Sequence, residues 1–154
     1  MKGGTAHLQA IAIIIPWFGQ EVKGGAEQLA WQVATRLAER GYRVEVLTTC
    51  CRSFQDDWAT NHFDAGASQE SGMTIRRFPV DARDRAAFER VNSRMLSLPP
   101  GRCKPGVGPV SEEEAAIFVN ENIGSQALLE HLRASRSAYE HFLFLPYLYG
   151  PILH

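Results

Sequence analysis

The pattern of hydrophobic and polar positions in the first fifty residues predicts a strand, a helix and a second strand. Residues 10–15 form an uninterrupted apolar run rich in isoleucine and ended by Pro16, which is typical of a strand buried on both faces of a parallel sheet. A helical periodicity follows over 26–40, and residues 43–49 have the pattern of the next strand. This order predicts two parallel strands joined by a right-handed crossover, with 10–15 as the central strand.

The predicted helix has one apolar side made of two rows. One row repeats every four residues, and alanines one step around the helix form the other. The two rows are Leu29, Val33 and Leu37, and Ala30, Ala34 and Ala38. We expect this side to face the sheet, and we expect Gly41 to end the helix in a left-handed conformation.

The rest of the chain alternates between loops and further elements. Polar and aromatic residues mix over 50–72, so we expect a long loop across the strand ends there. The elements that we expect after it are a strand over 73–79, a helix over 83–98, a helix that begins at the Ser111 capping box and resumes beyond Gly124, and a strand over 142–145.

Length and composition indicate one globular domain over 1–154. A hydrophobic content of 45% with 21% charged residues excludes the disordered and disulfide-dense classes. The alternation of strands and helices predicts an α/β fold, a Rossmann-like open and mainly parallel sheet flanked by helices.

The net charge of the chain and the length of its apolar runs limit its possible partners and its location. A net charge of −1, from 16 basic and 17 acidic residues, gives no general attraction for a polyanion, so we expect no nucleic-acid partner. The longest apolar run, 10–16, is far shorter than the ~18 residues of a membrane-spanning helix. We therefore expect a cytoplasmic protein with at most peripheral membrane contact. The three cysteines, two of them adjacent, fit neither a disulfide framework nor a CxxC metal pair, so we expect reduced thiols and no metal.

Residues 23–27, Lys-Gly-Gly-Ala-Glu, follow the first strand and open the predicted helix. Ligands of open α/β sheets bind at the carboxyl ends of the strands. Gly24 and Gly25 let the backbone approach a ligand closely, and free N–H groups at a helix start favour an anion such as phosphate. The alternative is that these glycines only form a turn. The G-x-G-x-x-G spacing of a nicotinamide site and the lysine-Ser/Thr pair of a Walker loop are both missing, which disfavours an NAD-type oxidoreductase.

Several stretches resemble the amino-terminal domain of family 4 glycosyltransferases, which have the two-domain GT-B architecture. The most specific are Ile13-Ile-Ile-Pro-Trp-Phe18, Gly24-Gly-Ala-Glu27 and Leu37-Ala-Glu-Arg-Gly-Tyr-Arg-Val-Glu-Val-Leu-Thr48. Residues 57–62, 75–79 and 144–150 resemble a bacterial branch of the same family, so the resemblance covers most of the chain.

The resemblance implies transfer of a sugar, with retention at the anomeric carbon, from a nucleotide-sugar donor to a glycan, lipid-linked or small-molecule acceptor. It implies no metal or other cofactor beyond the nucleotide-sugar co-substrate. It assigns Gly24, Gly25 and Glu27 to the loop near the donor's diphosphate and sugar. The nucleotide and the E-x7-E glutamate pair belong to the family's carboxy-terminal domain. Because these 154 residues do not supply that domain, we expect the chain alone to be inactive.

Five aromatic and histidine residues are further candidates for acceptor or sugar contacts. Trp17 and Phe18 end the first strand, Tyr147 and Tyr149 follow the last predicted strand, and His62 lies in the long loop. For each of them, ordinary packing or a loop hydrogen bond is the competing interpretation.

The sequence also departs from the family and leaves a second function open. Pro146 stands where many relatives carry a histidine near the donor sugar. Arg76 and Arg77 alternate along a strand, so at most one of them faces an anionic ligand. We expect the arginines that follow, at positions 83, 85, 90 and 94, to form a solvated helix face. The alternative to a transferase is a stand-alone, non-catalytic Rossmann-like binding or assembly module that pairs with itself or a partner through the apolar residues 146–154.

Overall fold

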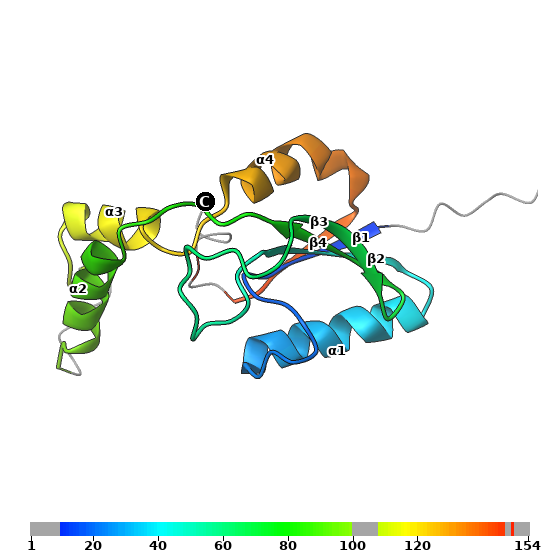
Figure 1. Ribbon diagram of the computed structural model, residues 1–154, viewed down its shortest axis with the longest axis horizontal. Helices are drawn as coiled ribbons and strands as arrows, with labels where there is room; N and C mark the ends of the chain where they lie inside the picture. The colour runs from blue at the N-terminus through cyan, green and yellow to red at the C-terminus, as the bar shows by residue number, and fades with distance from the viewer. Residues whose placement is uncertain (1–9, 100–107, 147–148, 150–154) are drawn as a thin grey trace, which may run out of the picture.

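The computed structural model describes residues 10–99, 108–146 and 149, in which strands and helices succeed one another as an α/β fold requires (Figure 1). The elements in chain order are β1 (Ala10–Ile14), α1 (Gly25–Glu39), β2 (Arg43–Thr49), β3 (Gly66–Glu70), β4 (Met73–Phe78), α2 (Arg85–Leu96), α3 (Glu112–Asn120), α4 (Gln126–Ser135), the 3-10 turn η1 (Arg136–Ala138) and β5 (His141–Phe144).

Five strands form one sheet in the order β3-β4-β2-β1-β5. β1, β2, β4 and β5 are parallel, and only β3 is antiparallel to its neighbour β4. This is the Rossmann-like open α/β sheet that the sequence predicts. β1 is an interior strand between β2 and β5, but the central position belongs to β2, because β4 and β3 are both added on the β2 side.

β3 corrects the sequence prediction of one long loop over 50–72. All of its residues are exposed, so it carries no buried apolar pattern from which a strand could be predicted. It pairs with β4 across a two-residue turn, Ser71-Gly72, in which both φ angles are positive, 48° and 79°. Positive φ at both central positions is the geometry of a type I′ hairpin turn. The Ser71-Gly72 pair is therefore the feature of the sequence that could have indicated a hairpin here.

One helix covers each face of the sheet, α1 below and α4 above in Figure 1. Alternate residues of β1 point to opposite faces. Those on the α1 side join β2, β4 and α1 in one core cluster, which includes Ile11, Ile13 and Ile15. Those on the α4 side, including Ala12 and Ile14, pack with β2 and α4 in the other. Both faces of β1 are therefore buried, as its sequence predicts.

The buried face of α1 differs in part from the expected one. Ala30 and Ala34 are fully buried, with Val33 and Leu37 packed partly against the same cluster. Leu29, which we expected on this side, is 52% exposed. Small alanine side chains allow the helix axis to approach the strands closely, so the alanine row lies at the centre of the contact and Leu29 falls at its margin.

α2 and α3 pack against each other at the far left of Figure 1, beyond the carboxyl ends of the strands. Both have a side-chain N-cap, and the capping box of α3 is the one that the sequence predicts. The Asp84 side chain accepts the backbone N–H of Ala87, and Ser111 and Glu114 form a reciprocal capping box. An ion pair between Arg94 and Glu114 joins the two helices. Within this pair, α2 lines one of the pockets described below.

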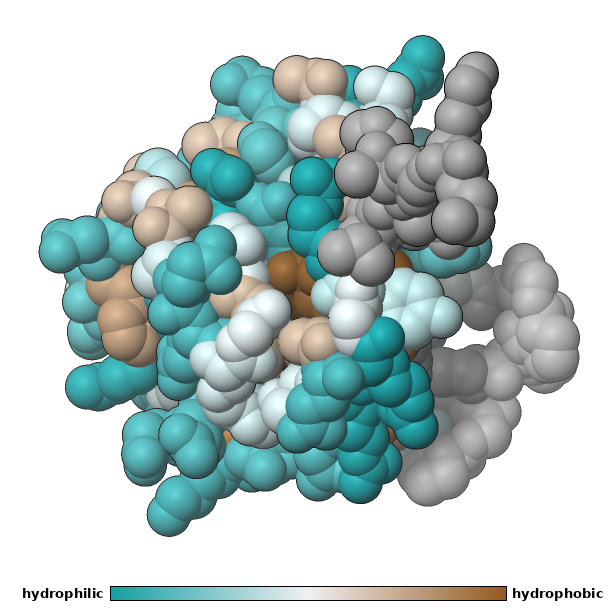
Figure 2. Space-filling view, turned by 90° about the vertical axis from the view of Figure 1, so that its right-hand side faces the viewer, coloured by the Kyte–Doolittle hydropathy of each residue, from teal (hydrophilic) through white to brown (hydrophobic). Residues whose placement is uncertain are grey.

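The opposite end of the molecule is mixed in character where its surface is visible. Figure 2 shows this end, at the amino ends of the strands, with hydrophilic colour over most of the visible face and hydrophobic colour in separate patches. Among the helices of the described residues, none is long and apolar enough to cross a bilayer.

Candidate functional site

The candidate site lies where the order of strand addition in the sheet reverses. The chain proceeds from β1 to β2 and β4 on one side, and then returns to place β5 on the other side of β1. The carboxyl ends of β1 and β5 therefore flank a topological switch point, which is the usual ligand position in open α/β sheets. A pocket of about 320 Å³ opens there, between the loop that follows β1 and the residues that follow β5. Its lining includes Lys23, Gly24, Gly25, Glu27 and Tyr149.

The pocket contains the amino-terminal end of α1. Gly24 is the N-cap residue, and no side chain caps this end. The first backbone bond of the helix runs from the N–H of Gln28 to the carbonyl of Gly24, at 2.9 Å. The N–H groups of Gly25, Ala26 and Glu27 precede that bond, so they belong to the unbonded first turn that is available to an anion.

The two glycines occupy different surroundings. A Cβ added at Gly25 would have no heavy atom within 4 Å among the described residues, so the backbone is open to the pocket there. A Cβ added at Gly24 would lie 2.6 Å from Cδ of Glu27 and closer still to its Oε2. Only Gly25 is therefore free for a ligand, whereas the space over Gly24 holds the Glu27 carboxylate.

Glu27 is the most unusual polar group of the site. It is only 7% exposed, and its carboxylate lies over Gly24, in the space that a Cβ at that position would fill. A negative charge in the first turn is stabilised by the helix dipole, which offsets part of its desolvation. Together with burial, this charge raises the pKa of Tyr149. The pocket thus combines free backbone donors with a buried acceptor, a set that suits a ligand carrying both phosphate and hydroxyl groups.

Trp17 and Phe18 lie inside the protein, and their side chains are fully buried. The Trp17 indole Nε1–H donates to Sγ of Cys51 at 3.3 Å, and the Phe18 ring packs on Trp31 with a centroid separation of 5.3 Å. This placement favours the packing interpretation for both residues over direct acceptor contact.

Of the remaining sequence candidates, Tyr149 joins the glycine-loop pocket and His62 does not. Tyr149 lines the pocket, with its ring against Trp17 at 4.7 Å between centroids. His62 lies outside the pocket lining and faces Asp56 at 3.7 Å, where its backbone N–H donates to the carbonyl of Cys50. Tyr147 lies outside the described residues.

Two pockets adjoin the first, and Gln55 lines all three. The larger of the two has a volume of about 810 Å³, and Arg77 is part of its lining. The Nη2 of Arg77 donates to the carbonyl of Phe18 at 2.9 Å, and its guanidinium carbon lies 4.0 Å from the ring centroid of Phe63. Arg76 pairs with Glu45 instead, at 2.6 Å. The two arginines thus differ as the strand alternation predicts, since Arg77 lines this pocket and Arg76 binds Glu45.

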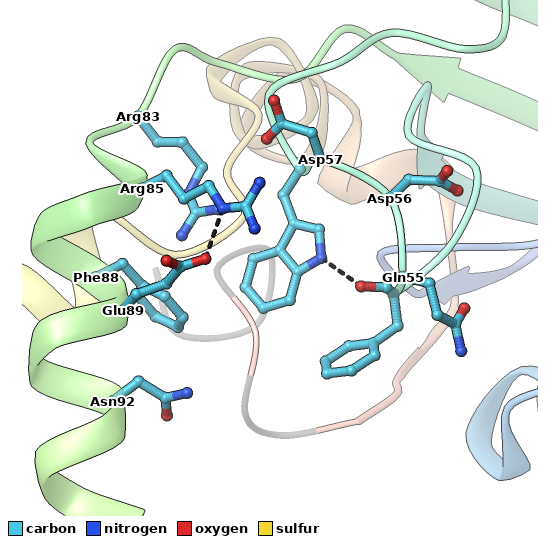
Figure 3. A pocket seen from close by; sticks show the side chains of 10 residues that line it. Gln55, Asp56, Asp57, Arg83, Arg85, Phe88, Glu89 and Asn92 are labelled. Carbon is cyan, nitrogen blue, oxygen red and sulfur yellow. Dashed lines mark hydrogen bonds and ion pairs between the residues drawn. The ribbon is translucent and has the colours of Figure 1, made fainter.

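The smaller neighbour lies between the turn after β2 and the first turns of α2 (Figure 3). Sequence reasoning missed it, since we expected Arg83 on the same solvated face that Arg85 does occupy. Arg83 is instead partly buried against the rings of Trp58 and Phe88. The contact joins residues 25 positions apart along the chain, which local periodicity does not reveal.

The cysteines and acidic groups provide no further chemistry at the site. Cys50 and Cys51 are free and buried, and burial raises the pKa of both thiols. Across the part of the chain that the structure describes, no three His, Cys, Asp or Glu side chains gather in a way that could hold a metal ion.

Comparisons of the chain with protein-family models, with curated proteins and with solved structures gave no match.

Proposed function

We propose that this chain is the acceptor-side half of a retaining glycosyltransferase, and that its glycine loop contacts the diphosphate of a nucleotide-sugar donor. The observation that carries the proposal is the open Gly25 backbone at the uncapped start of α1, in a pocket at the switch point of the sheet. Backbone N–H groups there would stabilise the negative charge that develops on the leaving diphosphate.

Glu27 has a role in this proposal that complements the amides. A largely buried carboxylate accepts strongly from hydroxyl groups, and a donor sugar supplies them. Its negative charge also disfavours a bare phosphate directly over Gly24. We therefore assign the diphosphate to the side of Gly25 and the sugar hydroxyls to the side of Glu27.

The acceptor and the cellular setting follow from the same assignment. The reaction needs the acceptor hydroxyl beside the donor sugar, so the acceptor enters through a pocket that adjoins the glycine loop. The donor's nucleotide is held by a second domain of the complete enzyme. Nucleotide-sugars are cytoplasmic metabolites, so we place the reaction there, with peripheral membrane contact where the acceptor is linked to a lipid.

The test is a transfer assay on the complete polypeptide that the reading frame encodes, with a panel of nucleotide-sugars. We expect one donor to be consumed and NMR of the product to show retained anomeric configuration. We expect Gly25→Val to abolish turnover while the protein stays folded, because the added side chain fills the pocket and not the core. An inverted product, or undiminished turnover in the valine variant, contradicts the proposal.

An assembly module is the second candidate, and one observation favours it. β5 is an edge strand, and its residues Phe142, Leu143 and Phe144 are 36%, 38% and 48% exposed. An unpaired apolar edge is a common site of strand pairing between chains. Light scattering across a concentration series tests it. A dimer that Phe144→Asp abolishes, in a protein without transferase activity, favours the module.

A further inference from the structure

The pocket between the turn after β2 and α2 has the composition of a sugar site. It has a volume of about 220 Å³, below the range of about 300–1,000 Å³ that drug-sized ligands occupy, so it accommodates one ring-sized group. Phe54 and Gln55 line both this pocket and the glycine-loop pocket. A group bound here is therefore the immediate neighbour of a group bound at Gly25.

The apolar wall of this pocket is made of aromatic rings that contact one another. The Trp58 indole Nε1–H donates to the carbonyl of Phe54 at 3.0 Å, and its ring meets Trp17 and Phe88 at centroid separations of 5.6 and 5.5 Å. Phe54 beside it is 54% exposed. Exposed aromatic surface that is fixed in place is a platform on which the C–H face of a sugar ring packs without loss of side-chain entropy.

The polar wall combines donors and acceptors. Arg83 donates through Nε to the carbonyl of Glu121 at 2.7 Å, while its Nη2 is buried and has no hydrogen-bond partner among the described residues. Arg85 pairs with Glu89 at 2.5 Å on the exposed face of α2. Figure 3 shows Arg83 and Arg85 projecting toward the turn that carries Asp57, with Glu89 on the α2 side of the same space.

The charges of this wall select between ligand classes. The lining holds two arginines and three carboxylates, those of Asp56, Asp57 and Glu89, so a phosphate would meet at least as much repulsion as attraction. A purely apolar ligand would desolvate five charged groups without replacing their hydrogen bonds. A neutral ring with several hydroxyl groups donates to the carboxylates, accepts from the guanidinium groups and packs on the aromatic wall.

We infer that this pocket binds one neutral sugar ring, and that this ring is the acceptor's terminal residue. The first part stands on the pocket alone, whereas the second rests on the proposed function. The proximity of the two pockets, which share the Phe54–Gln55 turn, sets an acceptor hydroxyl beside the donor sugar at the glycine loop.

Titration of the chain with neutral methyl hexosides tests the binding site. Backbone amide NMR shifts should map to the Trp58 turn and to α2, with a Kd in the millimolar range that suits so small a ligand. Glu89→Ala removes one charged hydrogen-bond acceptor and should weaken binding about tenfold. Glu113→Ala, on the exposed side of α3 and outside the pocket lining, is the matched control and should bind as the unmodified chain does.

Inorganic phosphate distinguishes a sugar site from an anion site. Asp57→Asn keeps the shape of the side chain and the acceptor of the Ala59 N–H, but removes one negative charge. At a sugar site it should leave phosphate binding undetectable and change hexoside binding by no more than a few-fold. Phosphate binding that appears or strengthens in Asp57→Asn, or hexoside shifts that fail to saturate, overturns the inference.

The complete polypeptide separates the failure of this site from that of the proposed function. If Glu89→Ala raises the KM for acceptor and leaves the KM for donor unchanged, both stand. If transfer occurs with an unchanged acceptor KM in Glu89→Ala, the acceptor assignment fails and the transferase survives. If hexosides bind but no sugar is transferred, the proposed function fails and the sugar site survives.

Discussion

Replacement of each glycine of the α1 start by alanine tests whether the backbone there is reserved for a ligand. Gly25→Ala adds a methyl group in open space, at the first residue of α1 and outside the left-handed region of φ. Alanine is about 0.5–1 kcal/mol better than glycine in a helix, so the free energy of unfolding should rise by up to that amount. For a chain of this length the corresponding increase in Tm is about 2–4 °C per kcal/mol.

Gly24→Ala should have the opposite effect on stability. Its methyl group would overlap the Glu27 carboxylate, 2.6 Å from Cδ, so that side chain must swing out of its buried position. Alanine is also a poorer N-cap residue than glycine. We expect a loss of about 0.5–1.5 kcal/mol. Gly19→Ala, in the same connector, is the control, because its methyl would make an ordinary 3.6 Å contact with Val22.

Urea denaturation gives the three stabilities, and steady-state kinetics of the complete polypeptide give the effect on donor use. The decisive result is whether Gly25→Ala changes stability and donor use in opposite directions. A glycine retained only for a turn would leave the KM for donor unchanged when replaced by alanine. A glycine retained for close approach should yield a more stable protein with at least about tenfold lower kcat/KM. Higher stability together with full activity would refute the reasoning.

Predictions at three other positions test the packing that holds the site. Glu45→Leu leaves Arg76 and the Tyr139 hydroxyl without the carboxylate acceptor that they meet at 2.6 and 2.8 Å. It should lower the free energy of unfolding, measured in urea, by about 1–3 kcal/mol, whereas Glu45→Gln should lower it less. Equal losses in the two variants would show that these hydrogen bonds do not stabilise the protein. Burial and Arg76 lower the pKa of His131, so the unfolded state takes up the proton first as pH falls. The free energy of unfolding should therefore decline below about pH 6.5, and His131→Gln should make that decline less steep. If the pH profiles of stability coincide for the two proteins, the prediction is wrong. Burial raises the pKa of the Cys51 thiol, so an alkylating reagent at neutral pH should label Cys51 only after urea is added, as peptide mass mapping can measure. Rapid labelling of Cys51 in the native protein would contradict this prediction.

The sequence predicts the β1-α1-β2 unit well because its signals are local. A β-branched run, a 3.6-residue periodicity and a terminal glycine are each read within a few residues. β2 spans Arg43–Thr49 as predicted, and Gly41 has the expected positive φ of 86°. β3 shows the limit of this reasoning, since a strand whose residues are all exposed has no apolar pattern, and its pairing with β4 is what makes it a strand.

The candidate site is predicted only as far as it is local. The position of Gly24 and Gly25 at the start of a helix follows from the sequence, but the carboxylate of Glu27 over Gly24 does not, since it depends on a side-chain conformation set by burial. Similarly, the contact of Arg83 with Trp58 depends on where the turn after β2 lies relative to α2. Charge patterning along α2 alone favours a solvated arginine.

The feature that assembles the site is the reversal in the order of strand addition after β4, because β5 is added on the far side of β1 and not beyond β4 or β3. Right-handed crossovers that run in opposite directions across a sheet place their helices on opposite faces. α1 occupies one face, so the return crossover through α4 covers the other, and Leu128 anchors it by full burial against that side of the sheet. β5 can then join only the free edge of β1, which brings Tyr149 to the pocket at Gly25. The glycine loop therefore becomes half of a pocket through the packing of a helix a hundred residues away, and not through its own sequence.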